Sequence, residues 1–142
     1  MFNRILIPVD LSHEEQLPLL TGAAQQLIGG EQGSINLLFV DPSLVHQGSF
    51  PLLNQATFEA HRRESLNSLQ ALAERWIPEP LRGDCRVCSG TPYDQILEES
   101  QRLRADAILM MSARPGLSSY FIGSNAEKVV RHADCSVFVI RA

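Results

Sequence analysis

The chain has 142 residues, of which 44% are hydrophobic and 20% charged, and its formal net charge at pH 7 is -4. This size and composition predict one globular domain, residues 1–142, with a substantial core. The charge argues against a nucleic-acid partner, because a phosphate-tracking surface needs clustered basic residues and Lys128 is the only lysine. No apolar run approaches the roughly 20 residues of a membrane span. Three cysteines and no leader segment lead us to expect a cytoplasmic protein.

Five short segments have the character of strands in a parallel sheet. Three of them are continuous apolar runs, as expected for strands buried on both faces. The second is apolar except for Asn36, and the third contains an arginine. Pro8 falls near the C-terminal end of the first run, where a missing N–H is most easily tolerated. In chain order the predicted strands are Ile5–Val9, Ile35–Val40, Cys85–Cys88, Ala107–Met111 and Val137–Ile140.

Four segments between the strands carry apolar residues at the spacing of a helix face. The pair Gly29-Gly30 ends the first and Pro78 ends the second, whereas Thr91 is a suitable cap for the third. Ser124 and Glu127 have the pattern of a capping box at the start of the fourth. The predicted helices are Pro18–Ile28, Gln55–Trp76, Pro92–Leu103 and Ser124–Ala133, and residues 43–54 are expected to form a long loop near a site mouth.

The strict alternation of strands and helices predicts βαβ units and a parallel sheet. In such a sheet ligands bind beyond the carboxyl ends of the strands, where the strand order reverses. Asp10, Val40-Asp41 and Met111–Arg114 each follow or end a predicted strand. Three distant segments are therefore expected to meet in one crevice.

The stretch from Ala107 to Asn125 is the most informative part of the chain. A buried strand leads into a polar loop that contains Arg114, and then Gly123 and Ser124 open a helix. The free N–H groups and positive dipole end of a helix start attract phosphate. A nucleotide, if bound, should place its phosphates here. The plainer alternatives are that Ser124 only caps the helix, Arg114 is a solvated loop residue, and Asp10 only caps a turn.

Other chemistries have weaker support. Cys85 and Cys88 have the spacing of a redox or zinc pair, but residues three apart on a strand face opposite sides, and no second Cys/His pair lies at a matching distance. The four histidines show no metal spacing, although His13 lies near the predicted crevice. Neither a Gly-x-Ser-x-Gly nucleophile elbow nor a Walker loop is present.

These segments, in this order, resemble the universal stress protein family over nearly the whole chain. The matching pieces are Ile5–Asp10 with Ser12, Leu38–Asp41, Gly90–Ile96, Ala105–Met111, Gly123–Ala133 and Cys135–Ile140. The resemblance implies a Rossmann-like, adenine nucleotide alpha hydrolase-like fold, with one doubly wound five-stranded parallel sheet of order 3-2-1-4-5 and four helices. It also implies a homodimer, or a tetramer built from it, in which the last strand, Val137–Ile140, pairs between subunits.

One branch of the family binds ATP, with Mg²⁺ a further ligand that carboxylates such as Asp10 or Asp41 could hold. Carried over to this chain, Asp10 and the backbone of Val40 would bind the adenosine end. The loop at Met111–Arg114 and the helix start at Gly123 would bind the phosphates. The candidate nucleotide site comprises Pro8, Val9, Asp10, Ser12, Val40, Met111, Ser112, Ala113, Arg114, Gly123, Ser124 and Asn125.

The chain departs from the ATP-binding loop pattern of Gly-x-x-Gly, nine residues and Gly-Ser. Ser112 replaces the first glycine, Pro115 or Gly116 stands near the second, and the interval to Gly123 is shorter. This loop resembles the variant of the type F subfamily. Three hypotheses follow: an ATP-binding regulator with little turnover, a nucleotide-independent dimerisation module with a vestigial cleft, and a weak hydrolase of adenosine phosphates.

Overall fold

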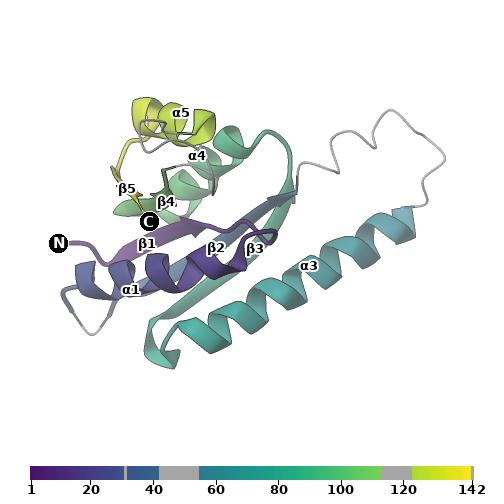
Figure 1. Cartoon of the computed structure of the whole chain (residues 1–142), viewed down its shortest axis with the longest axis horizontal. Coiled ribbons are helices and arrows are strands. Elements are labelled where there is room, and N and C mark those ends of the chain that lie inside the picture. The colour runs from purple at the N-terminus through teal and green to yellow at the C-terminus, as the bar shows by residue number, and fades with distance from the viewer. Residues whose placement is uncertain (31, 42–54, 113–122, 142) are drawn as a thin grey trace.

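The computed structural model describes residues 1–30, 32–41, 55–112 and 123–141. Within them, five parallel strands form a single sheet of order β3-β2-β1-β4-β5 (Figure 1). The strands are β1 (Arg4–Pro8), β2 (Ser34–Asp41), β3 (Arg82–Ser89), β4 (Ala107–Met111) and β5 (Ser136–Ile140). The predicted five-stranded, doubly wound sheet and its strand order are confirmed.

Four α-helices connect the strands in the described part of the chain: α1 (Leu17–Leu27), α3 (Gln55–Trp76), α4 (Pro92–Leu103) and α5 (Ser124–His132). Two short 3-10 helices, η1 (Glu14–Gln16) and η3 (Glu79–Leu81), precede α1 and β3. None of the described helices is both long and apolar enough to cross a membrane.

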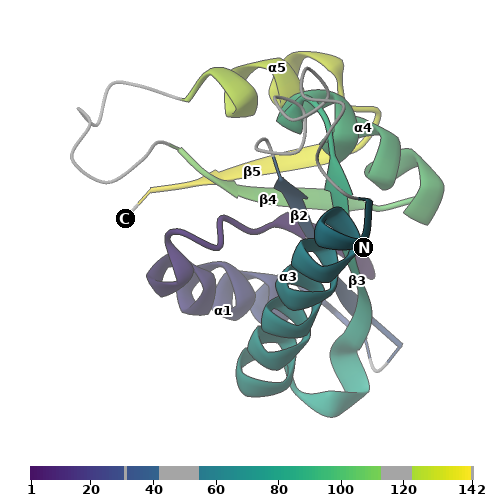
Figure 2. The ribbon, with the colours of Figure 1, turned by 90° about the vertical axis from the view of Figure 1, so that its right-hand side faces the viewer.

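Helices cover both faces of the sheet. Figures 1 and 2 show α1 and α3 on one face and α4 and α5 on the other. Successive residues of β1 point to opposite faces, so Ile5 and Ile7 pack with α1 and α3, whereas Leu6 packs with α4 and α5. All three are fully buried. After the exposed Arg4, the central strand is apolar because neither face of Ile5–Ile7 meets water.

Strand β3 is longer than predicted, because it begins at Arg82 and not at Cys85. The added residues are polar or glycine, so they carry no apolar signal. They are tolerated because β3 lies at the edge of the sheet and Arg82, Gly83 and Asp84 are exposed. The pairing of β3 with β2 shifts register here, between Ile35 and Leu37.

Asn36 fills that irregularity with its side chain. Its Oδ1 accepts the Asp84 N–H at 2.8 Å, and its Nδ2 donates to the Ile5 carbonyl at 3.1 Å. Asn36 is buried, so these bonds satisfy groups that water cannot reach. A Cβ on Gly83 would collide with the Asn36 amide, which explains the glycine at this position.

The amino ends of β1 and β4 are joined through Asp106. Its Oδ2 accepts the N–H groups of Asn3 and Arg4 at 2.8 and 2.7 Å, and its own N–H donates to the Arg4 carbonyl at 2.7 Å. The two backbone hydrogen bonds lower the pKa of Asp106 below its ordinary value. This carboxylate therefore fastens the N-terminus of the chain to a segment about a hundred residues away.

Candidate functional site

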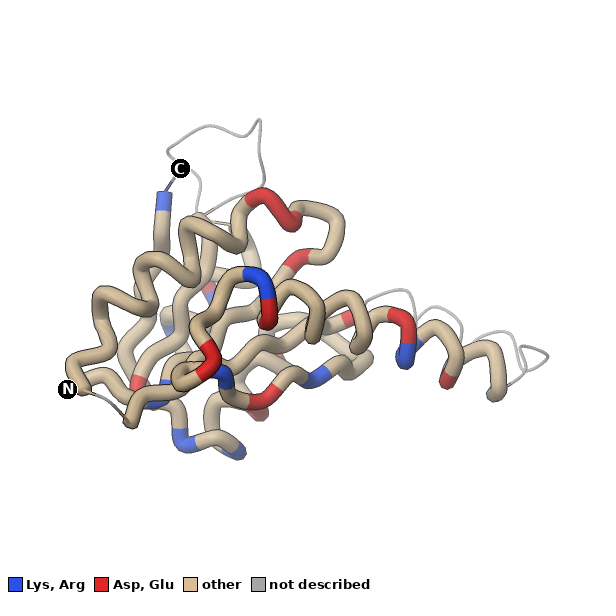
Figure 3. The backbone as a smooth tube through the Cα atoms, turned by 90° about the horizontal axis from the view of Figure 1, so that it is seen from below, with Lys and Arg blue, Asp and Glu red and all other residues tan. Residues whose placement is uncertain are grey.

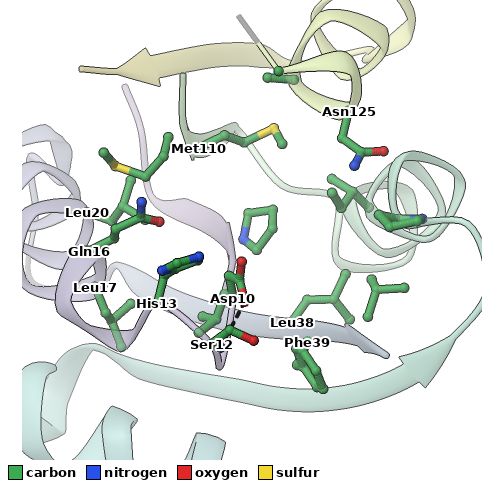
Figure 4. A pocket seen from close by; sticks show the side chains of 18 of the residues that line it. Asp10, Ser12, His13, Gln16, Leu17, Leu20, Leu38, Phe39, Met110 and Asn125 are labelled. Carbon is green, nitrogen blue, oxygen red and sulfur yellow. Dashed lines mark hydrogen bonds between the residues drawn. The ribbon is translucent and has the colours of Figure 1, made fainter. Parts of the chain in front are cut away.

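A cavity of about 810 Å³ opens at the carboxyl ends of the strands. It lies between β1 and β4, where the strand order reverses. The side chains around it come from β1 and the turn after it, from η1, β2 and β4, and from α1, α4 and α5 (Figure 4). This is the position at which doubly wound sheets bind their ligands. Ten of the twelve predicted site residues line the cavity, and the other two, Ala113 and Arg114, lie outside the described residues.

The first wall of the cavity is the turn after β1. The Asp10 carboxylate accepts the Ser12 N–H at 2.9 Å, and the Asp10 carbonyl accepts the His13 N–H at 2.9 Å (Figure 4). Asp10 therefore stabilises this turn, as expected for a residue that caps a turn. Asp10 also lines the cavity, and its second carboxylate oxygen has no hydrogen-bond donor within the described chain. A turn-forming carboxylate can thus still accept a ligand hydroxyl.

The opposite wall is the start of α5. The expected capping box is wrong: Gly123 is the N-cap, no side chain caps the helix, and Glu127 pairs with Arg131 at 3.0 Å. The cause lies in the backbone, since the Gly123 N–H donates to the Ser112 carbonyl and so fixes where the helix begins. Ser124 is consequently the first helical residue and is exposed at the cavity.

Three N–H groups at this helix start are available to a ligand. The first internal bond of α5 runs from the Glu127 N–H to the Gly123 carbonyl at 3.0 Å. The N–H groups of Ser124, Asn125 and Ala126 precede it and have no acceptor within the described chain. Together with the helix dipole they form a site suited to an anion.

Sequence reasoning did not place several other lining residues in the site. Gln16, Phe39, Pro92 and Ile96 line the cavity, and the last three lie within the segments Leu38–Asp41 and Gly90–Ile96 that carry the family resemblance. His13, which was near the predicted crevice, does line it, with its Nδ1 3.2 Å from Glu15 Oε1. Helix periodicity could have found Ile96, because it lies on the apolar face of α4 that packs toward the sheet.

Within the described chain the cavity is acidic, because Asp10 and Asp41 line it and no lysine or arginine does. Asp41 is buried at the end of β2, and its Oδ2 lies 2.8 Å from Nε2 of His61 on α3. The described residues contain no cluster of three potential metal ligands of the His, Cys, Asp or Glu type. Among the described lining residues, the donors suited to an anionic ligand are the backbone N–H groups at the start of α5 and the helix dipole.

Cys85 and Cys88 do not form a paired site. Cys85 packs against the core under α1 and α3, whereas Cys88 packs against the core under α4 and α5. Burial, followed by nearby carboxylates, raises the pKa of both thiols. The prediction that the two residues face opposite sides of the strand is confirmed.

The fold and cavity define a class: a doubly wound α/β protein with a ligand cleft at its topological switch point. A model of the universal stress protein family matches residues 1–141, and the chain belongs to this family. It is 31% identical, over 146 residues, to universal stress protein G of Shigella flexneri, with 99% of this chain and 100% of that protein covered.

Solved structures show the same fold. The universal stress protein UspA from Lactobacillus plantarum superposes with a TM-score of 0.64 at 25% identity, covering 99% of this chain and 98% of that one. A universal stress protein in complex with cAMP superposes with a TM-score of 0.59 at 16% identity, covering 99% and 97%. The second likeness is one of fold alone.

Proposed function

We propose that this protein binds ATP in the cleft as a regulatory ligand of a stress response, with little or no turnover. The observation that carries the proposal is the pairing of two walls: the Asp10 turn on one side and, on the other, the N–H groups of α5 that lack acceptors within the described chain. The first suits a ribose, and the second suits phosphates. The cAMP complex of a family member adds support, since that neighbour binds an adenine nucleotide.

The adenosine end of ATP would lie against Asp10 and the backbone of Val40, and the phosphates would lie at Gly123–Asn125. Low turnover is proposed because Asp41 is hydrogen-bonded to His61, whereas Asp10 accepts the Ser12 N–H with one oxygen and would accept a ribose hydroxyl with the other. A general base must be placed to take a proton from water, which such partners oppose. Mg²⁺ would accompany the phosphates, with Asp10 or Asp41 as its oxygen ligand.

We also propose that the protein acts in the cytoplasm as a homodimer through β5, which could assemble further into a tetramer. Strand β5 is the last strand of the sheet, and Val137–Ile140 are only partly buried. Val130, on the neighbouring α5, is 49% exposed. Pairing with a second copy would cover an apolar sheet edge that would otherwise favour aggregation. Light scattering at micromolar concentration tests this, and a monomer contradicts it.

The first experiment is to denature freshly purified protein and identify any released nucleotide by chromatography and mass spectrometry. Calorimetric titration with ATP and Mg²⁺ then compares the natural protein with Asp10→Ala and with Glu79→Ala, an exposed carboxylate at the other end of the sheet. We expect Asp10→Ala to weaken ATP about tenfold, or about 1.4 kcal/mol, and Glu79→Ala to have no effect. Absence of saturable binding by the natural protein at millimolar ATP contradicts the proposal.

A nucleotide-independent dimerisation module is the second candidate. It is favoured by the bond from the Gly123 N–H to the Ser112 carbonyl, because this bond uses within the protein one N–H of the predicted phosphate site. Ser112→Gly separates the two functions. Glycine should create ATP binding if the serine blocks the cleft, and should change the affinity little if the site already works.

A further inference from the structure

Asp41 places a buried carboxylate at the wall of the cleft. It is the last residue of β2, follows Val40 directly, and is 4% exposed. A buried carboxylate is costly unless a hydrogen-bond donor or a positive charge compensates it. His61 supplies such a donor, since its Nε2 lies 2.8 Å from Asp41 Oδ2 and a carboxylate can only accept. A side chain of α3 therefore sets the environment of a residue in the cleft wall.

His61 lies in the half of α3 that does not pack on the sheet. From Ser65 onward the helix has a buried face, which includes Leu69 and Ala73, but none of residues 56–64 is buried. Figures 1 and 3 show this half of α3 extending past the body of the protein. The hydrogen bond from His61 to Asp41 ties this projecting half of the helix to the sheet.

We propose that His61 is a positioning residue for the nucleotide cleft, and that it couples cleft occupancy to the docking of residues 56–64. The inference rests on the proposed nucleotide binding. By holding Asp41, His61 fixes the end of β2 and with it the neighbouring Val40 backbone, against which the adenine would lie. Coupling between two sites is reciprocal, so a bond that favours the nucleotide must itself be strengthened when the nucleotide binds.

The test combines ATP titration with hydrogen exchange of residues 56–64, measured on the full chain with and without ATP. His61→Ala removes the His61 donor, and His61→Gln replaces it, because a glutamine amide can donate to the carboxylate. Arg63→Ala is the control, since Arg63 is exposed in the same half of α3. Circular dichroism and a denaturation curve for each variant establish that the fold is retained.

We expect His61→Ala to weaken ATP about tenfold, within the usual range for coupled sites. His61→Gln should recover most of this loss, and Arg63→Ala should bind as the natural protein does. ATP should slow exchange in residues 56–64 of the natural protein by up to the same factor and should lose this effect in His61→Ala. A role limited to stability would lower the denaturation midpoint without making exchange depend on ATP.

The inference is overturned if the natural protein binds ATP and His61→Ala binds it equally well, or if ATP leaves the exchange of residues 56–64 unchanged. Either result leaves the proposed function intact. If the natural protein shows no saturable ATP binding, the proposed function and the coupling fall together. The two failures are therefore told apart by the titration of the natural protein alone.

Discussion

The two ends of the sheet are built for different tasks. At the amino ends of the strands, side chains close the structure: Asp106 binds the backbone of Asn3 and Arg4, and Asn36 binds Asp84 and Ile5. At the carboxyl ends the chain leaves a cavity of about 810 Å³ and backbone N–H groups that lack acceptors within the described chain. We infer that the amino ends of the strands contribute mainly to stability and the carboxyl ends mainly to ligand binding. Changes at the closed end should affect unfolding, and changes at the open end should affect the ligand.

The largest effect is expected for Asn36→Leu at the closed end. Leucine leaves the part-buried Asp84 N–H and the buried Ile5 carbonyl without this partner. The loss of a buried partner costs about 1–3 kcal/mol, so we expect the free energy of unfolding to fall by about 3 kcal/mol. Urea denaturation measures this. Ser34→Ala is the control, because it removes only a second acceptor of the Asn36 amide, at 3.2 Å. A variant as stable as the natural protein would show that this end is not closed by Asn36.

Ser124→Asp should have the next largest effect, at the open end. A carboxylate at the first position of α5 would repel ATP phosphates and weaken binding by about tenfold, or about 1.4 kcal/mol. The same charge interacts well with the helix dipole and should stabilise the fold by about 0.3–1 kcal/mol. Ser68→Asp, at an exposed position on α3, provides the matched control. A gain in stability together with a loss of affinity would support the division of tasks between the two ends of the sheet, and a loss of both would contradict it.

Asp106→Asn tests the closed end through pH. Because the folded protein lowers the pKa of Asp106, the ionised carboxylate stabilises the fold above the ordinary pKa, and this contribution is lost as pH falls through the lowered value. We expect the variant to be less stable by about 1 kcal/mol at neutral pH, a typical value for an exchanged hydrogen bond. The difference in stability between the variant and the natural protein should become smaller in acid. Urea curves near neutrality and in acid check this, with Asp134→Asn as control; a gap that does not change with pH contradicts the assignment.

The smallest effect is expected for the rates at which the three cysteines react with a thiol reagent. Burial raises the pKa of Cys85, Cys88 and Cys135, so less thiolate is present at mildly alkaline pH than in the unfolded chain. We expect each to react several-fold more slowly with a thiol reagent in the folded protein than in urea, as followed by mass spectrometry. If Cys88 alone reacted at its unfolded rate, the carboxyl end of β3 would be opening locally.

The sequence predicted what depends on local pattern. Apolar runs such as Ile5–Val9 are visible because strands buried on both faces exclude polar residues. The start of β3 was missed because Arg82–Asp84 pair as an exposed edge, where composition is unconstrained. The capping box failed because a distant carbonyl, that of Ser112, binds the Gly123 N–H and sets the helix start. The contact between His61 and Asp41 joins residues 20 apart through tertiary packing, and no periodicity encodes it.

The pairing of β1 with β4 also sets an order of assembly. Ile5 pairs with Ala107, so the first strand made must wait for most of the chain before one of its two neighbours exists. Its other neighbour, β2, begins at Ser34, and this half of the sheet can form early in synthesis. The cleft lies at the seam between β1 and β4. A chain truncated before β4 lacks one wall of the cleft, so ligand binding would report that synthesis and folding have both reached the second half of the sheet.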